Sequence, residues 1–234
     1  MTNPILRGDL RARAASRKIV AIELFYVGVL AVLAWFGMAP ELGARAADQT
    51  ASLTTALLVV QGILVTYFVS ACAAQEIAVE SEKSSVDLAF APFAPRTIIA
   101  GKSVATLVTV GYWLLLGAPL VALAAGIRRD PTAGVLGAAA FTGVVAWSIG
   151  QMGLWLGIAV ESEFSRTLVH WSGLLLIFVG TLALPMPART VNPVLGIAAA
   201  QSGTLSPAAY GGYIAFGLLC DAAARLSLRR YARA

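Results

Sequence analysis

The chain has 234 residues, of which 59% are hydrophobic and only 12% carry a charge, and its formal net charge is +5. Soluble domains carry roughly 25% charged residues, so this composition excludes an ordinary soluble protein and favours a polytopic membrane protein. A bilayer core of about 30 Å requires roughly 20 apolar residues per helix. Six such helices with their loops would use almost the whole chain.

Residues 1–18 are predicted to form an amphipathic helix that lies in the membrane interface. Asn3 suits the N-cap and Pro4 suits the first helical position. Apolar side chains share one face of this helix, at Ile5, Leu6, Leu10 and Ala14. The basic residues lie largely on other faces, which is typical of an interfacial helix. The alternative is a disordered basic tail that only fixes the topology.

Six apolar runs follow, and each is predicted to cross the membrane as a helix. They occupy residues 19–38, 53–72, 103–127, 133–160, 167–184 and 207–223. Little of the chain is left for a soluble domain, so residues 19–234 are predicted to form a single all-α transmembrane domain. Residues 185–206 depart from the apolar pattern and are broken by Pro185, Pro187 and Pro193.

The basic residues predict the orientation of these helices. With both termini inside, 13 of the 17 Lys and Arg residues lie in inner segments, and the outer segments hold only Arg45, Arg128, Arg129 and Arg189. The positive-inside rule therefore places both termini in the cytoplasm. Because the basic residues flank apolar runs in this way, the net positive charge does not indicate nucleic-acid binding.

Residues 75–102 form a charged segment between the second and third apolar runs. Its larger apolar residues recur with a helical pattern, at Ile77, Val86, Phe90 and Phe93. Its charged residues lie on other faces, at Glu76, Glu80, Glu82, Lys83, Asp87, Arg96 and Lys102. A partly helical, charged segment on the cytoplasmic side of a membrane bundle predicts a docking surface for a partner protein.

The sequence predicts no catalytic, nucleotide or metal site. Gly101, Lys102 and Ser103 match the end of a phosphate-binding loop, but Arg96 replaces the first Gly of that motif and no strand precedes it. The only histidine is His170, and the chain has neither an H-E-x-x-H nor a G-x-S-x-G motif. An intramembrane enzyme would need such groups, so any ATPase or metal chemistry is expected in another chain.

Three polar residues inside predicted spans are candidates for a substrate path: Gln61, Gln151 and His170. Side chains of this kind usually bond across helices, so a structural role is the alternative for both amides. For His170, the alternative is an interfacial hydrogen bond near Glu163 or Arg166.

Two further features lie within the spans. Glu23 is close enough to the cytoplasmic interface to reach water or to pair with Arg17 or Lys18. Small residues recur in the fourth run, at Gly150, Gly153 and Gly157. They indicate close helix packing, either within the bundle or between protomers.

The residues between the second and third runs resemble those of a known family, the membrane subunits of type-2 ATP-binding-cassette (ABC) exporters. In that family the corresponding loop carries a run similar to E-x-E-[KR]-G-T-x-[DE]-L-L, followed by a Pro, an Arg and a Gly-Lys. The matching residues here are Glu80, Glu82, Lys83, Asp87, Leu88, Pro92, Arg96, Gly101 and Lys102. Asn192-Pro193 and the turn from Glu161 to Ser165 also look like the family. The chain departs from it at Ser84-Ser85, where Gly-Thr is usual.

This resemblance implies a permease of the bacterial or archaeal cytoplasmic membrane. Residues 75–102 would contain a coupling helix that docks on a separate ABC ATPase, and Pro92 would belong to that contact. ATP and Mg²⁺ would bind the ATPase, which would be present in two copies. A second copy of this chain, or a similar permease, would complete the pathway within the lipid. Residues 185–206 would be re-entrant on the outer side.

The implied function is export of a lipidic, amphipathic or hydrophobic small molecule. The alternative is a membrane anchor or sensor that transports nothing and whose cytoplasmic segment docks a signalling or scaffold partner. Under either hypothesis the chain itself is not an enzyme.

Overall fold

The computed structural model describes residues 17–38, 46–83, 95–185 and 188–231, and every regular element in these ranges is helical. The long helices are α2 (Arg17–Met38), α3 (Ala46–Lys83), α5 (Pro95–Arg128), α6 (Thr132–Ala159), α7 (Glu163–Phe178) and α9 (Pro207–Tyr231). Between α7 and α9 lie two 3₁₀ turns, η2 (Gly180–Ala183) and η3 (Ala188–Val191), and the short helix α8 (Pro193–Gln201).

Five helices in the described part of the chain are long and apolar enough to cross a membrane. Their apolar segments are Ile19–Gly37, Leu53–Gln75, Thr97–Ile127, Thr132–Ala159 and Glu163–Ala183. These correspond to the first five predicted spans. The sixth predicted span lies in α9, which has the length to cross but is not among the five, because Asp221 and the arginines that follow it make α9 more polar.

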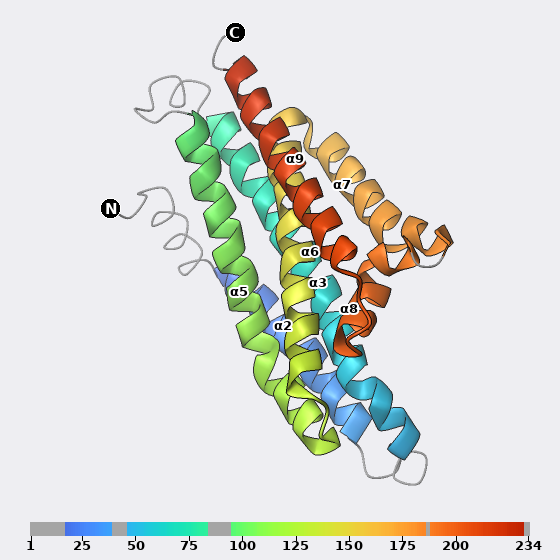
Figure 1. Cartoon of the computed structure of the whole chain (residues 1–234). Helices are drawn as coiled ribbons and strands as arrows, with labels where there is room; N and C mark the ends of the chain where they lie inside the picture. Colours follow the sequence, from blue (N-terminus) through green and yellow to red (C-terminus); the bar gives the residue numbers. More distant parts are fainter. Residues whose placement is uncertain (1–16, 39–45, 84–94, 186–187, 232–234) are drawn as a thin grey trace.

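The helices run up and down between two ends of the bundle (Figure 1). The end of α2, the start of α3 and the turn between α5 and α6 gather at one end. The ends of α3, α6 and α9 lie at the other, together with the starts of α5 and α7. This alternation agrees with the predicted order of inner and outer segments.

Helix α6 is the centre of the bundle and packs against α3, α5, α8 and α9. All three glycines that indicated close packing face neighbouring helices: Gly153 and Gly157 meet the backbone of α3, and Gly150 lies between Thr106 and Val69. Of the two alternatives for this pattern, packing within the bundle is therefore the one observed.

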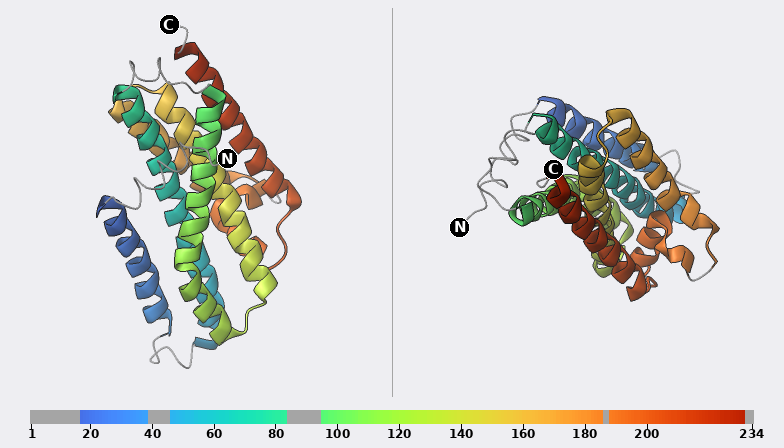
Figure 2. Two further views of the ribbon diagram at one scale, coloured as in Figure 1. Left: turned by 90° about the vertical axis from the view of Figure 1, so that its left-hand side faces the viewer. Right: turned by 90° about the horizontal axis from the view of Figure 1, so that it is seen from above.

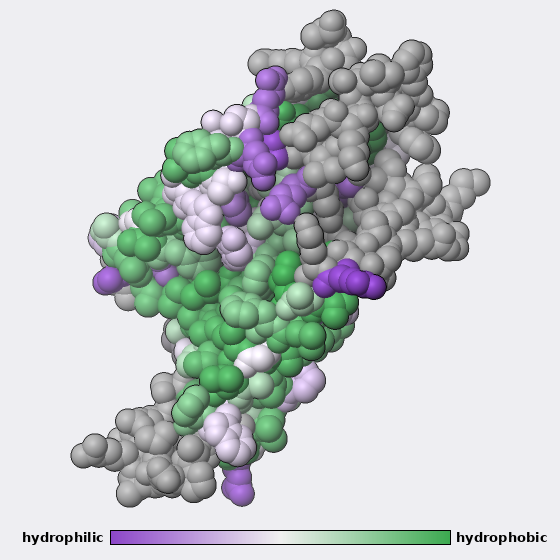
Figure 3. All heavy atoms as spheres, turned by 180° about the vertical axis from the view of Figure 1, so that it is seen from behind, coloured by the Kyte–Doolittle hydropathy of each residue, from purple (hydrophilic) through white to green (hydrophobic). Residues whose placement is uncertain are grey.

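Helix α2 lies at the edge of the bundle (Figure 2). Its inner face buries Tyr26 and Leu30, whereas Leu24, Phe25 and Trp35 are exposed. Apolar side chains this exposed on several helices would be unfavourable in water but suit a lipid environment. Seen from behind, the surface is mostly hydrophobic, with hydrophilic side chains gathered mainly toward its upper part (Figure 3).

Two helices are longer than their predicted spans. Helix α3 continues to Lys83 rather than ending near residue 72, and α5 begins at Pro95 rather than near residue 103. Residues 73–83 contain no Gly or Pro and are rich in Ala, Glu and Gln, which are good helix formers. Proline is favourable at the first position of a helix, which explains why α5 begins at Pro95.

Candidate functional site

The predicted docking segment falls partly on the ends of α3 and α5. Glu76, Glu80, Glu82 and Lys83 belong to the last turns of α3, and Arg96 belongs to the first turn of α5, but their side chains lie outside the described part of the structure. The central residues of the predicted segment, Asp87, Phe90, Pro92 and Phe93, lie outside the described residues altogether. The predicted amphipathic helix over residues 1–18 lies almost entirely outside them as well.

Lys102 is the member of this set whose side chain is described, and it is only 1% exposed. The structure therefore places it inside the bundle rather than on the surface that a partner would contact. A Lys side chain is rarely buried unless it is paired, and Lys102 does make a polar interaction.

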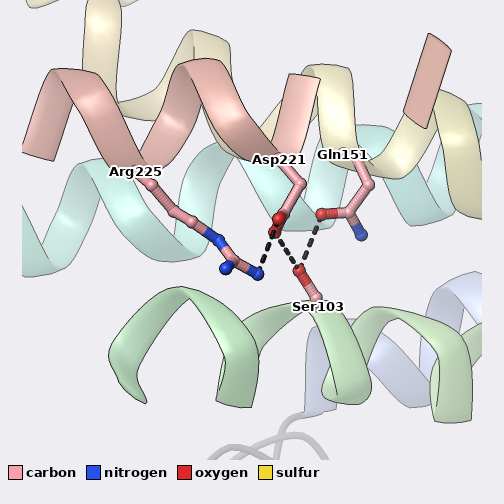
Figure 4. A network of polar contacts seen from close by, with 4 residues as sticks. All are labelled: Ser103, Gln151, Asp221 and Arg225. Atoms are coloured by element: carbon pink, nitrogen blue, oxygen red, sulfur yellow. Dashed lines mark hydrogen bonds and ion pairs between the residues drawn. The ribbon is translucent and has the colours of Figure 1, made fainter. Parts of the chain in front are cut away.

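Next to Lys102, a group of four polar side chains joins three helices (Figure 4). Ser103 on α5 places its Oγ 2.8 Å from Gln151 Oε1 on α6 and 2.9 Å from Asp221 Oδ1 on α9. Arg225, one turn further along α9, donates from Nη2 to Asp221 Oδ2 at 2.7 Å. We call these residues the Ser103 cluster.

Counting hydrogens fixes the direction of the bonds in the Ser103 cluster. The Ser103 hydroxyl has one hydrogen and cannot donate to both oxygens at once. With the Gln151 amide turned so that Nε2 faces Ser103, Gln151 donates to Ser103 and Ser103 donates to Asp221. This orientation also gives a partner to Gln151 Nε2, which otherwise has none among the described residues. In this arrangement the series of hydrogen bonds from Gln151 through Ser103 ends at the Asp221 carboxylate.

Two members of the Ser103 cluster are buried, whereas the Arg225 side chain is 39% exposed. Gln151 is fully buried, and Asp221 is only 9% exposed. A buried carboxylate is costly unless it is paired and hydrogen-bonded, and here it has both a guanidinium and a hydroxyl. Loss of either partner would leave a poorly compensated charge among three packed helices.

Gln61 lies on α3 and is also buried. Its Nε2 donates to the carbonyl of Leu114 on α5 at 3.1 Å. Beside it, the Tyr26 hydroxyl donates to the carbonyl of Trp113 at 2.9 Å. Gly117 provides the space for both, since a Cβ on it would meet Tyr26 Oη and Gln61 Nε2. These bonds join α2, α3 and α5.

His170 is buried on α7 and bonds to α3. Its Nε2 lies 2.8 Å from Ser70 Oγ, and the Ser70 hydroxyl donates to the carbonyl of Tyr67 at 3.1 Å. Because Ser70 uses its one hydrogen there, His170 is the donor in their bond. The observed partner is therefore Ser70 of α3, whereas the sequence had predicted only a hydrogen bond near Glu163 or Arg166.

Two further charged side chains, Arg166 and Glu23, have local partners. Arg166 donates to the carbonyls of Val160 (3.2 Å) and Glu161 (3.0 Å), just beyond the end of α6. A cation there stabilises the helix C-terminus. Glu23 hydrogen-bonds with Tyr112 on α5; the Lys18 side chain, one of its expected partners, lies outside the described part of the structure.

The structure therefore does not bring Gln61, Gln151 and His170 together. Each of the three bonds to a different neighbour and joins a different set of helices. The sequence analysis missed Ser103, Asp221 and Arg225 as partners. One signal was present, because Asp221 is an ionisable residue within the sixth predicted span, and such residues are functional candidates.

No protein-family model matches this sequence, and no curated protein matches it significantly. Within the described ranges, no three His, Cys, Asp or Glu side chains are grouped as they would be in a metal site.

Proposed function

We propose that this chain is the permease subunit of an ATP-driven ABC transporter that exports a lipidic, amphipathic or hydrophobic small molecule. A separate ATPase subunit hydrolyses the ATP, and two copies of it act on a pair of permeases. The proposal rests on the resemblance of residues 80–102 to that family, together with the geometry of the helices on either side.

The observation that carries the proposal is the length of α3 and α5. They contain 38 and 34 residues, which correspond to about 57 and 51 Å at 1.5 Å per residue. A hydrocarbon core of about 30 Å cannot hold either helix fully unless it is strongly tilted. The end of α3 and the start of α5 lie at the same end of the bundle (Figure 1), on either side of residues 84–94.

This arrangement suits a mechanical contact. A force applied to residues 84–94 would act on two long helices at once, and both helices pack against α6. Apolar anchors with a charged rim, such as Phe90 and Phe93 with Glu82, are typical of a protein–protein interface. We propose that the ATPase docks here in the cytoplasm.

The rest of the bundle is consistent with a half-transporter. We propose that α9 is the sixth membrane-crossing helix and that both termini are cytoplasmic. We further propose that η2, η3 and α8 form the re-entrant segment on the outer side. Helix α8 packs against α3 and α6, as irregular backbone at membrane depth requires.

The test uses the purified chain and a candidate ABC ATPase from the same organism. We expect no ATP hydrolysis by the chain alone and a stable complex when the two are co-expressed. Glu82→Ala combined with Phe90→Ala should abolish complex formation, measured by co-purification. The matched control is Glu163→Ala combined with Phe164→Ala, which also removes one acid and one Phe but lies outside residues 75–102. Phe164 is exposed and lies near the same end of the bundle. This control should leave the complex intact.

A complex that survives the Glu82→Ala/Phe90→Ala change would show that the docking assignment is wrong. If the chain instead captures a partner that does not hydrolyse ATP, the anchor or sensor function would be favoured.

A further inference from the structure

We propose that Ser103 is a positioning residue that locks the first turns of α5 to α6 and α9, so that movement of the start of α5 is passed to both helices. This inference rests on the proposed function, in which an ATPase acts on residues 75–102. The role proposed for the Ser103 cluster is separate from docking of the ATPase and is not implied by the family resemblance.

The position of Ser103 along α5 supports this role. Ser103 lies eight residues after the start of α5 at Pro95, or about 12 Å along the helix axis. The other places where α5 bonds to a neighbouring helix include Tyr112, Trp113 and Leu114. These lie about 14 Å or more beyond Ser103 along α5. A displacement of the start of α5 would therefore act on the Ser103 cluster before it acts on these three residues.

The chemistry of the cluster makes the three helices move together. Apolar side chains can slide past one another, but a buried hydrogen bond that breaks leaves its groups without water to replace the partner. Here the Ser103 hydroxyl lies between Gln151 and Asp221, and Arg225 donates to the same carboxylate (Figure 4). If α5 shifted alone, the Gln151 amide would lose its partner, and the Asp221 carboxylate would keep only Arg225 of its own helix.

A first experiment tests the lock in the isolated chain, without any ATPase. Ser103→Ala and Asp221→Ala are measured singly and together by thermal unfolding in detergent. Since both changes break the same bond, we expect the double variant to lose less stability than the two single losses combined. Additive losses would overturn the proposal, whatever the function of the protein. Ser148→Ala, which removes a hydroxyl bond from α6 to the Tyr213 carbonyl of α9, should be additive with Asp221→Ala.

A second experiment tests transmission in the complex with the ATPase. One nitroxide per chain is placed at Val104 on α5 or at Leu226 on α9, both of which are exposed. Its accessibility to a water-soluble relaxant is measured before and after trapping with ADP and vanadate. We expect both labels to respond in the wild type. In Ser103→Ala we expect the Val104 label to respond as before and the Leu226 label to lose more than half of its response.

The control variants separate transmission from stability. Ser103→Thr keeps the hydroxyl and should preserve the response at Leu226, and so should Ser148→Ala. An undiminished response at Leu226 in Ser103→Ala would overturn the proposal. If the wild-type chain forms no complex with the ATPase, the proposed function and the transmitting role of Ser103 fail together, while the unfolding experiment still decides whether the lock exists.

Discussion

Gly153 has no room for a side chain. A Cβ built on it would collide with the carbonyl oxygen of Ser70 on α3, and a Cβ on Gly157 would lie 2.6 Å from the carbonyl oxygen of Ala74. The obstacle is backbone, which cannot turn aside as the end of a side chain can. These two glycines therefore set how closely the central helix α6 approaches α3.

We expect Gly153→Ala to destabilise the bundle although Ala is the better helix former. Overpacking in a close contact costs about 1–3 kcal/mol, which exceeds the gain in helix propensity of about 1 kcal/mol. The measurement is the thermal unfolding midpoint in detergent. Gly211→Ala is the control, because a Cβ there meets nothing within 4 Å, and it should be neutral or stabilising. Equal effects at the two sites would contradict the packing argument.

At the residue scale, the sequence predicted roles better than partners. The spacing of Gly150, Gly153 and Gly157 predicted close packing, and the chemistry of Gln151 and His170 suggested hydrogen bonds. The partners, such as Ser103 and Ser70, could not be predicted, because serine is common in membrane helices and its own pattern carries no information on which helix it faces. Only the tertiary arrangement brings together residues 48 and 100 positions apart.

Asn192 organises the whole segment between α7 and α9. Its Oδ1 accepts from the backbone N–H groups of Val194 (3.0 Å) and Leu195 (3.3 Å), which caps α8. Its Nδ2 donates to the Phe178 carbonyl at 2.7 Å and to Thr181 Oγ1 at 2.9 Å. One fully buried side chain therefore joins the end of α7, η2 and the start of α8.

We expect Asn192→Asp to destabilise this segment, even though Asp caps helices about as well as Asn. A carboxylate cannot replace the Nδ2 donor, and it would place an oxygen against the carbonyl of Phe178. Lost hydrogen bonds of buried groups cost about 1–3 kcal/mol each. The readout is protease resistance of the segment together with the unfolding midpoint. Ser162→Asp, at the exposed N-cap of α7, is the control and should be tolerated.

If Asn192→Asp and Ser162→Asp had the same small effect, the Nδ2 bonds would contribute nothing and capping alone would explain Asn192.

At the element scale, the sequence predicted a break but not its form. Pro185, Pro187 and Pro193 indicated that a single long helix could not span residues 185–206. The two 3₁₀ turns and α8 arise from contacts that the local sequence does not encode. Examples are the Tyr213 hydroxyl, which donates to the Val191 carbonyl at 2.7 Å, and Gly134 and Gly137 of α6, which approach the end of α8.

For the whole molecule, hydropathy predicted the order of the helices, because lipid requires a run of apolar residues whatever the helix packs against. It predicted the apolar spans of α3 and α5 but not how far these helices continue beyond them, because helix propensity rather than hydropathy decides that extension. Hydropathy also overestimated how apolar α9 is, because Asp221 lies within the predicted span. Asp221 can lie in the bundle because it pairs with Arg225.

The topology of the whole molecule can be tested at two exposed turns that lie at opposite ends of the bundle. Thr132 begins α6, and Ser162 precedes α7. In a chain with Cys72 and Cys220 replaced by Ala, we expect a membrane-impermeant maleimide to label Thr132→Cys in intact cells and Ser162→Cys only after permeabilisation. Equal labelling of both after permeabilisation is the control for reactivity. The reverse pattern would invert the bundle and move residues 84–94 outside, where no ATPase could reach them.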